Sequence, residues 1–158
     1  MNGSKDLKTI IYFKGVYDTL DLFTDHLIEA FESMGYGTFV YHTANEEVSK
    51  KMLLRLLGES QEFAAVTFNN LGYNLSFEQP EAAEGEEGKP EEYNIWDYFH
   101  IPYIDILMDH PFHYEKPLCN MPKTAVILCT DRNHVKYVRR FFKNIRQTDF
   151  LPHAGVEL

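Results

Sequence analysis

The densest group of residues able to do chemistry is a loop that holds Asp109, His110 and His113. Histidine exchanges a proton near neutral pH, and a neighbouring carboxylate can orient or activate it. We therefore interpret Asp109 and His110 as candidate catalytic residues and His113 as a candidate substrate-binding residue. These side chains are also of the types that bind metal ions, but their spacing matches no closed metal motif. The sequence predicts no metal centre, and a structural hydrogen-bonding role for the loop stays open.

Other polar residues follow the ends of further predicted strands. They are Gly15, Asn69, Arg132 and His153. Ligands of open parallel sheets bind beyond the carboxyl ends of the strands, so we expect these four residues to contact substrate. Arg132 stands in the first turn of a predicted helix, where its guanidinium can reach a phosphate or a carboxylate. The alternative is that these loops are polar simply because loops of α/β proteins generally are.

Several familiar motifs are absent from the sequence. Gly15 lies between a first strand and a first helix, whose N-terminus can hold an anion. However, neither the GxGxxG nor the GxxxxGK[ST] pattern occurs, which argues against a dinucleotide site and a phosphate-binding P-loop. A GxSxG serine nucleophile is also missing. Cys119 and Cys129 indicate neither a disulfide scaffold nor a zinc site. No cofactor is expected.

The elements that must position these residues follow from the hydrophobic pattern. Strands are predicted at residues 9–13, 38–42, 63–68, 103–108, 124–129 and 149–151. Helices are predicted from a cap at Asp18 to Gly35, from a cap at Asn45 to Gly58, at 95–99 and, after a cap at Asp131, at 132–142. The strands are apolar without clean alternation, as expected when both faces of a sheet are covered. The pattern predicts a Rossmann-like, three-layer α/β fold with a doubly wound parallel sheet of about six strands, forming one domain over 1–158.

The helix spacing also predicts which side chains are buried. In the first helix they are Leu20, Phe23, Leu27, Phe31 and Met34, and in the second they are Val48, Met52, Leu53, Leu56 and Leu57. In the last helix we expect Val135, Val138 and Phe142 to face inward, with Lys136, Arg139, Arg140 and Lys143 outward.

Charge is distributed unevenly along the chain, whose formal net charge is −9. Residues 78–92 contain seven Glu and one Lys, and their Glu-, Gly- and Pro-rich composition predicts a flexible surface loop. Residues 116–146 hold eight Lys or Arg against one Asp, which indicates a solvated helix face or a surface for anionic groups. The acidic total argues against nucleic acid as a partner. No apolar run is long enough for a transmembrane segment and no signal peptide is evident, so we expect a cytoplasmic protein.

Three segments in the second half of the sequence carry a family resemblance. They are Ile101-Pro102-Tyr103 with Asp109-His110-Pro111, then residues 129–134 (CTDRNH), then residues 150–155 (FLPHAG). In this order they resemble the N-terminal domain of the spore-maturation CgeB-like glycosyltransferases and the associated domain of unknown function. The resemblance runs from about Lys8 to the end and is strongest after His100.

That resemblance implies a GT-B architecture, in which two Rossmann-like domains face each other across a cleft. The C-terminal domain of such enzymes usually binds the nucleotide-sugar donor, and the N-terminal domain shapes the side of the sugar or glycan acceptor. The resemblance then implies that the loops after Gly15, Asp109 and His153 border the cleft. It also implies a partner domain in the same protein. The chain ends three residues after Gly155 without a closing helix, which predicts a fragment of a longer protein.

Three hypotheses for function remain at this point. The first is the acceptor-side domain of a glycosyltransferase, inactive without its donor domain. The second is a stand-alone Rossmann-like ligand-binding or regulatory module without catalytic activity. The third is a small metal hydrolase built on Asp109, His110 and His113.

Overall fold

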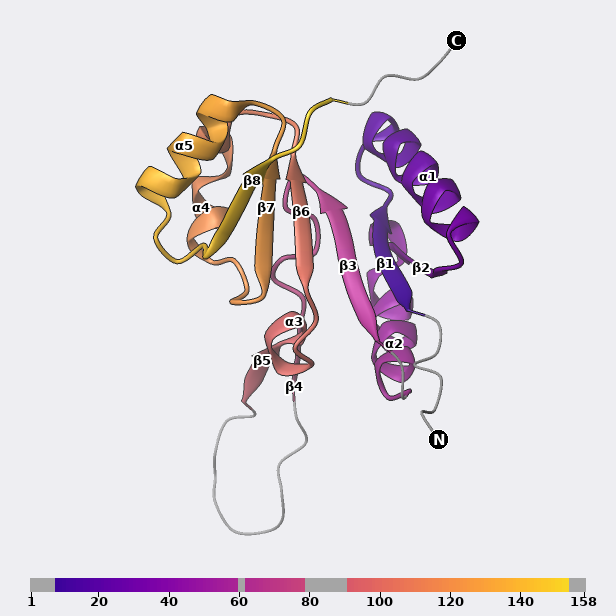
Figure 1. Ribbon diagram of the computed structural model, residues 1–158. Helices are drawn as coiled ribbons and strands as arrows, with labels where there is room; N and C mark the ends of the chain where they lie inside the picture. The colour runs from indigo at the N-terminus through magenta and orange to yellow at the C-terminus, as the bar shows by residue number, and fades with distance from the viewer. Residues whose placement is uncertain (1–7, 60–61, 79–90, 154–158) are drawn as a thin grey trace, which may run out of the picture.

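Six parallel strands form the central sheet of the protein. The computed structural model describes residues 8–59, 62–78 and 91–153. The order across the sheet is β2-β1-β3-β6-β7-β8 (Figure 1). The strands are β1 (Thr9–Lys14), β2 (Gly37–His42), β3 (Phe63–Phe68), β6 (Tyr103–Leu107), β7 (Ala125–Cys129) and β8 (Gln147–Phe150). The predicted α/β class and parallel sheet are therefore confirmed.

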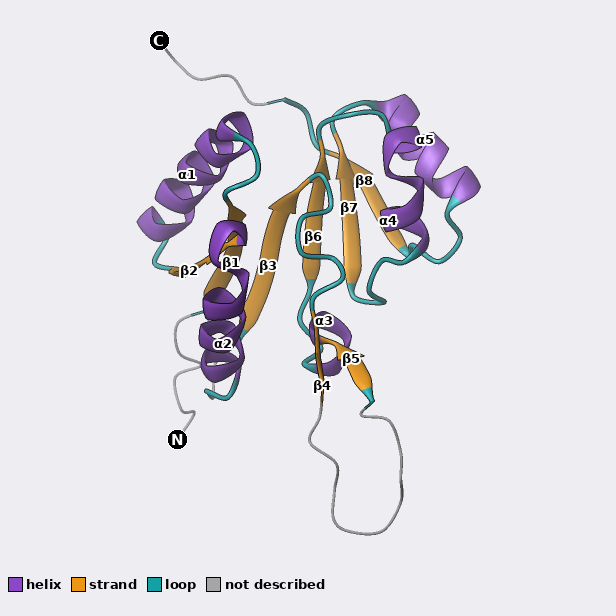
Figure 2. Ribbon diagram, turned by 180° about the vertical axis from the view of Figure 1, so that it is seen from behind, coloured by secondary structure: helices purple, strands orange, loops and turns teal. Residues whose placement is uncertain are grey.

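The helices are divided unequally between the two faces of this sheet. They are α1 (Asp18–Ser33), α2 (Glu46–Leu57), α3 (Ile95–Tyr98), α4 (Glu115–Cys119) and α5 (Arg132–Phe141), with 3₁₀ helices η1 (Thr43–Asn45) and η2 (Pro111–Tyr114). One apolar cluster packs side chains of α2, α3, α4 and α5 against the sheet. The other cluster joins the opposite face to α1 (Figures 1 and 2). Of the helices in the described part of the chain, α1 alone contributes to this second cluster.

The composition of β1 explains why a helix layer lies on each side. Ile11 and Phe13 face the α2 side, whereas Ile10 and Tyr12 face α1. All four are at most 5% exposed. Because successive side chains of a strand point to opposite faces, a continuous apolar run is stable only with cover on both.

The chain changes direction across the sheet next to β1. β1 pairs with β2 on one side and with β3 on the other. The connection after β1 enters α1 on one face, and Leu75 and Ile95, which follow β3, pack on the opposite face. Such a divergence opens a crevice at the carboxyl ends of the strands, where ligands of doubly wound folds bind.

Two of the predicted helix surfaces need correction. In α2, Val48 and Met52 are exposed, while Ser49, Leu53 and Leu57 are buried. The helix is rotated because the Ser49 hydroxyl exchanges hydrogen bonds with the backbone of His42, donating to its carbonyl and accepting from its N–H, each at 3.1 Å. Met34, also predicted to be inside, is 60% exposed beyond the end of α1.

The starts of the first helix and of the last strand also differ from the prediction. Asp18 is the first residue of α1 and not its cap, because the cap position is Tyr17. The last strand starts at Gln147 and not at residue 149. It is an edge strand that pairs only with β7, so polar residues such as Gln147 and Asp149 are tolerated there and hid its start.

The acidic segment 78–92 lies largely outside the described residues. Its two ends are described, and they are strands where a loop was predicted. β4 (Ser76–Glu78) pairs antiparallel with β5 (Glu92–Asn94), with Glu78 opposite Glu92. Among the residues that the structure describes, no helix has the length and apolar character needed to cross a bilayer.

Candidate functional site

A pocket lies where the carboxyl ends of β3 and β6 meet the first two turns of α1. We call it the polar pocket. Its volume is about 330 Å³, and its lining residues are Tyr17, Thr19, Leu20, Phe23, Asn69, Met108, Asp109 and Tyr114. Asn69 and Asp109 are therefore brought together as the sequence predicted, although they are 40 residues apart in the chain.

Asp109 is the charged group of the polar pocket and is held by two donors. Its Oδ2 accepts a hydrogen bond from Asn69 Nδ2 at 3.1 Å and another from the Tyr114 hydroxyl at 2.9 Å. Burial raises the pKa of Tyr114 well above its ordinary value, and the hydrogen bond to Asp109 adds to this effect. Tyr114 therefore stays protonated as a donor. Both bonds end on the same oxygen, so Oδ1 keeps its capacity to accept from a ligand.

Asn69 fixes this arrangement by joining the ends of two strands. Its side-chain Oδ1 accepts from the backbone N–H of Met108 at 2.9 Å, which directs the amide nitrogen to Asp109. Its φ of +49° lies in the left-handed region, which Asn enters more readily than most residues. An Asn directly after β3 thus supplies both the backbone turn and the hydrogen bonds that hold Asp109.

The loop between β1 and α1 is occupied by internal contacts. The N–H of Gly15 donates to both carboxylate oxygens of Asp21, at 3.0 and 3.1 Å. The ammonium of Lys14 forms a salt bridge with Asp25 at 2.7 Å. Asp18 adds a third carboxylate to the first half of α1. These negative charges satisfy the positive end of the helix dipole, so this N-terminus is a poor site for a phosphate.

His110 and Asp109 are adjacent in sequence but contact different elements. His110 Nδ1 accepts from the backbone N–H of Phe112 at 3.1 Å and so caps η2. Its ring packs against His134 and Tyr137 of α5, with ring centroids 4.6 and 5.0 Å apart. His110 and Asp109 therefore do not form an Asp–His pair.

The remaining predicted site residues lie apart from the polar pocket. His113 is exposed on η2, with its ring beside that of Phe112. The guanidinium of Arg132 lies 4.2 Å from the centre of the Phe150 ring. Arg132 follows Asp131, whose side chain caps α5 by accepting from the N–H of Asn133 at 2.6 Å, as the sequence predicted.

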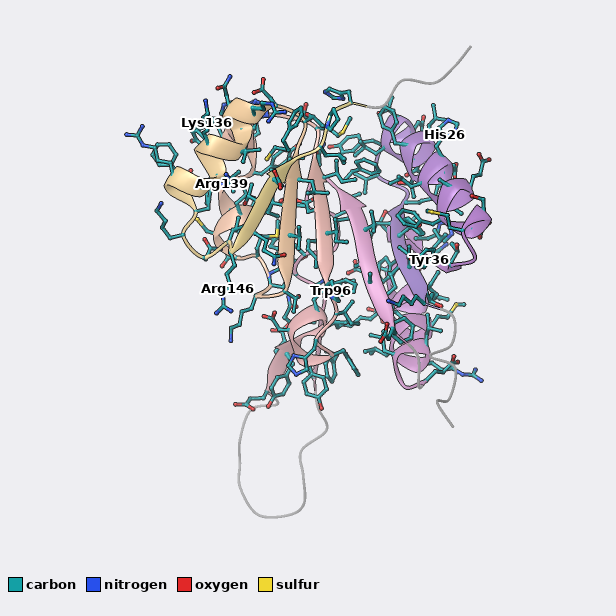
Figure 3. The ribbon with its side chains drawn as sticks, in the orientation of Figure 1. His26, Tyr36, Trp96, Lys136, Arg139 and Arg146 are labelled. Atoms are coloured by element: carbon teal, nitrogen blue, oxygen red, sulfur yellow. The ribbon has the colours of Figure 1, made fainter. Side chains whose placement is uncertain are left out.

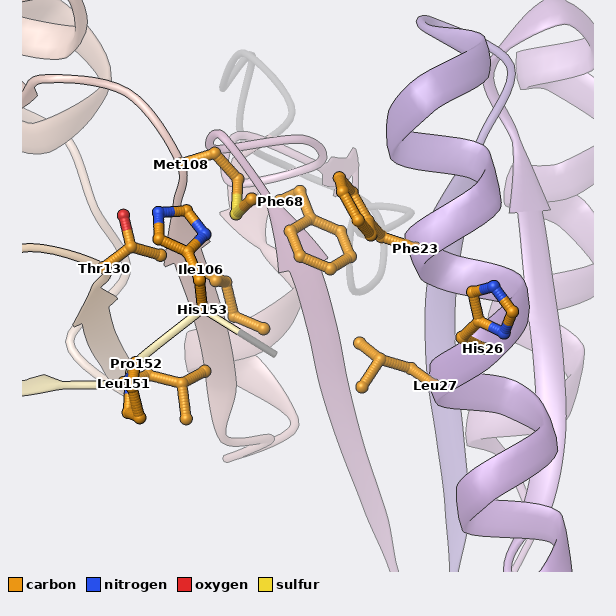
Figure 4. Close-up of a pocket in the computed structure, with 10 residues that line it drawn as sticks. All are labelled: Phe23, His26, Leu27, Phe68, Ile106, Met108, Thr130, Leu151, Pro152 and His153. Carbon is orange, nitrogen blue, oxygen red and sulfur yellow. The ribbon is translucent and has the colours of Figure 1, made fainter. Parts of the chain in front are cut away.

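His153 lines a second, larger cavity, which we call the apolar pocket. Its volume is about 480 Å³. The lining residues are Phe23, His26, Leu27, Phe68, Ile106, Met108, Thr130, Leu151, Pro152 and His153 (Figure 4). Phe23 and Met108 thus line both pockets.

The basic residues of the C-terminal third lie on the exterior. Lys136 and Arg139 of α5 and Arg146 after it are exposed (Figure 3). Arg139 also donates to the carbonyl of Thr148 at 2.6 Å, so part of this charge joins α5 to β8.

A buried carboxyl group lies near the site and was not among the predicted residues. Asp105 is fully buried on β6, and its Oδ1 accepts from the backbone N–H of Asn70 at 2.8 Å. Burial raises the pKa of Asp105 to about 7. Its Oδ2 and both side-chain polar atoms of Asn70 have no hydrogen-bond partner within the described chain. An Asp inside an otherwise apolar strand was the signal available in the sequence.

Some lining residues of the polar pocket carry no sequence signal. Tyr17, Thr19 and Phe23 belong to an amphipathic helix and its cap, where such residues usually pack or face solvent. Tyr114 reaches Asp109 only because η2 turns the chain back. Among residues 8–59, 62–78 and 91–153, no group of three or more His, Cys, Asp or Glu side chains is placed to hold a metal ion.

Comparisons with known proteins leave the family resemblance as a prediction. No protein family, no curated protein and no solved structure matches this chain significantly.

Proposed function

We propose that this chain is the acceptor-side domain of a GT-B-type glycosyltransferase and that the polar pocket binds a neutral sugar. The observation that carries the proposal is the position of Asp109. Its carboxylate is fixed by Asn69 and Tyr114 at the carboxyl ends of β3 and β6, in a pocket that the aromatic side chains of Tyr17 and Phe23 also line.

The chemistry of the polar pocket suits a polyhydroxylated ligand. A carboxylate oxygen accepts hydrogen bonds from sugar hydroxyls, while amide and phenol groups can both donate and accept. Tyr17 and Phe23 are exposed and offer ring faces to the C–H groups of a sugar. A few placed polar groups among aromatic walls are typical of small-molecule sites.

Electrostatics favour an uncharged acceptor over a nucleotide diphosphate. Asp18, Asp21 and Asp25 surround the first turns of α1, and Asp109 adds another negative charge at the pocket. A diphosphate would be repelled there. This fits the proposed division of labour, in which a donor domain elsewhere in the same protein binds the nucleotide sugar. In that enzyme Asp109 would accept the proton of the attacking hydroxyl.

A second candidate is a non-catalytic binding module that uses the same pocket. The observation in its favour is that His110 contacts Phe112 and α5 and is not paired with Asp109. Binding of a sugar does not require such a pair, whereas proton transfer often uses one.

The proposal is tested by titrating ¹⁵N-labelled protein with methyl glycosides and, separately, with nucleotide-diphosphate sugars. We expect glycosides to shift the amide signals of residues that line the polar pocket. Asp109→Asn should weaken binding about 10- to 100-fold, because a hydrogen bond to a charged group contributes about 1.5–3 kcal/mol. Tyr114→Phe should weaken it less, by about 10-fold. Asp149→Asn, a surface change on β8, is the matched control.

Different results separate the two candidates. Binding of nucleotide sugars at the start of α1, with no response to glycosides, would contradict the acceptor-side proposal. If glycosides bind, a transfer assay with the product of the whole reading frame decides between enzyme and module. Sugar transfer that is lost in Asp109→Asn supports the glycosyltransferase, and binding without transfer supports the module.

A further inference from the structure

The apolar pocket continues from the polar pocket along the same face of the sheet. Phe23 and Met108 form the wall that the two share. They are the two described residues that line both pockets, so the two cavities adjoin at Phe23 and Met108. The Phe23 ring lies 6.0 Å from that of Phe68, centre to centre, and is itself 38% exposed.

The walls of the second cavity are almost entirely hydrocarbon. Phe23 and Leu27 point from α1 toward Phe68 and Ile106 of the sheet, with Leu151 and Pro152 on the opposite side (Figure 4). Two imidazoles and the hydroxyl of Thr130 are its polar lining groups, and none of the described residues that line it carries a carboxylate or an ammonium group. Its volume of about 480 Å³ is within the range of cavities that enclose small organic ligands.

The cavity exists because this face of the sheet is only half covered. Within the described chain, α1 packs over β1 and β3, and no described helix lies over the same face of β6 and β7 (Figure 1). Ile104 and Leu128 on this face are only partly buried. A ligand that removes such apolar surface from water stabilises the complex that it forms with the protein.

We propose that the ligand of this protein is amphiphilic, with a sugar head group in the polar pocket and an alkyl or aryl tail in the apolar pocket. The inference rests on the proposed sugar site and adds the class of acceptor, a glycoside that carries a hydrophobic aglycone. The polar end supplies Asp109, Asn69 and Tyr114 for hydroxyl groups. The apolar end supplies Leu27, Ile106 and Leu151 for the tail.

The shape of the site favours a thin chain as the occupant. The ring centres of Phe23 and Phe68 lie 6.0 Å apart, and Phe23 belongs to the wall that the two cavities share. An α-helix of a partner, about 10 Å across with its side chains, would have to displace this aromatic pair. A hydrocarbon tail is narrower than a helix, and the side chain beside which it would pass, Phe23, is 38% exposed and lies at the surface.

The test compares methyl, butyl and hexyl glycosides of one sugar, each below its micelle-forming concentration, by calorimetric titration. We expect the affinity to rise up to about fourfold for each added methylene, until the cavity is filled. Leu151→Gln, on an exposed segment after β8, should abolish most of this gain and leave the affinity for the methyl glycoside unchanged. Leu22→Gln is the matched control, because Leu22 is exposed on α1 outside both cavities. Asp109→Asn should weaken all three glycosides by the same factor.

Three outcomes would overturn the inference, and they separate it from the proposed function. Equal affinities for the methyl and hexyl glycosides would remove the tail site while leaving the sugar site intact. Equal binding of hexanol and the hexyl glycoside, unaffected by Asp109→Asn, would show an apolar site unconnected to a sugar site and would count against both proposals. A stable dimer that Leu151→Gln dissociates, with no dependence on tail length, would assign this face to a second copy of the chain.

Discussion

Asp105 lies within β6 and Asp109 just beyond its end, and their surroundings give the two carboxyl groups different properties. Asp109 is exposed at the end of β6 and accepts hydrogen bonds from two side chains. Asp105 is fully buried within β6 and accepts one from the backbone of Asn70. Because solvation stabilises the charged form, the exposed group is the one suited to ligand contact, and the buried one is suited to staying protonated.

The buried carboxyl group should make stability depend on pH. Burial raises the pKa of Asp105 from 3.8 to about 7. Between these values the folded protein binds a proton that the unfolded chain does not, so stability falls as pH rises through this window and levels off above about 7. We expect Asp105→Asn, which resembles the protonated form, to remove this loss. From pH 5 to pH 8 the free energy of unfolding of the variant should rise, relative to that of the wild type, by on the order of 2–3 kcal/mol.

Urea unfolding at the two pH values measures this difference. The other ionisable groups are common to both proteins and cancel in the comparison. Asp149→Asn, an exposed change on β8, should show the wild-type dependence on pH. Parallel pH profiles for the wild type and Asp105→Asn would mean that Asp105 ionises normally in the folded protein.

At the scale of elements, the segment after β3 depends on the close approach of a glycine to the core. Gly72 has a φ of +77°, and its carbonyl accepts from the Trp96 indole at 2.7 Å. A Cβ there would lie 2.3 Å from the Phe13 ring, which is itself packed against Trp96. Gly35, which ends α1 at φ +88°, has open space around the same position.

Alanine substitution at these two glycines should therefore separate backbone strain from steric overlap. Gly35→Ala carries the cost of a left-handed alanine, about 1–2 kcal/mol. Gly72→Ala should lower the free energy of unfolding by about 1–3 kcal/mol more than Gly35→Ala does, because the Phe13 ring must move within a packed core. Denaturant unfolding of both variants gives the difference. Equal losses would mean that the Phe13 ring is free to move aside.

At the scale of the whole molecule, local patterns predicted the sheet better than they predicted the site. Continuous apolar runs such as that of β1 identify strands that are covered on both faces, whereas the polar edge strand β8 was predicted only in part. The association of Asn69 with Asp109 followed from the rule that parallel strands end at one edge. The contact between Tyr114 and Asp109 depends on how η2 turns, and the separation of His110 from Asp109 depends on packing against α5. Neither is encoded in residue spacing.

The place of each strand in the sheet also predicts which strands open first. β1, β3 and β6 each have a strand on both sides, whereas β8 pairs only with β7 and has exposed residues at Gln147 and Asp149. Amide hydrogens at a sheet edge exchange through local opening, while those of the centre require more global unfolding. We expect the amides of β1, β3 and β6 to exchange at least about 100-fold more slowly than those of β8, after correction for intrinsic rates. Hydrogen exchange followed by NMR measures this ratio, and equal protection of β8 and β3 would show instead that the sheet opens as one cooperative unit.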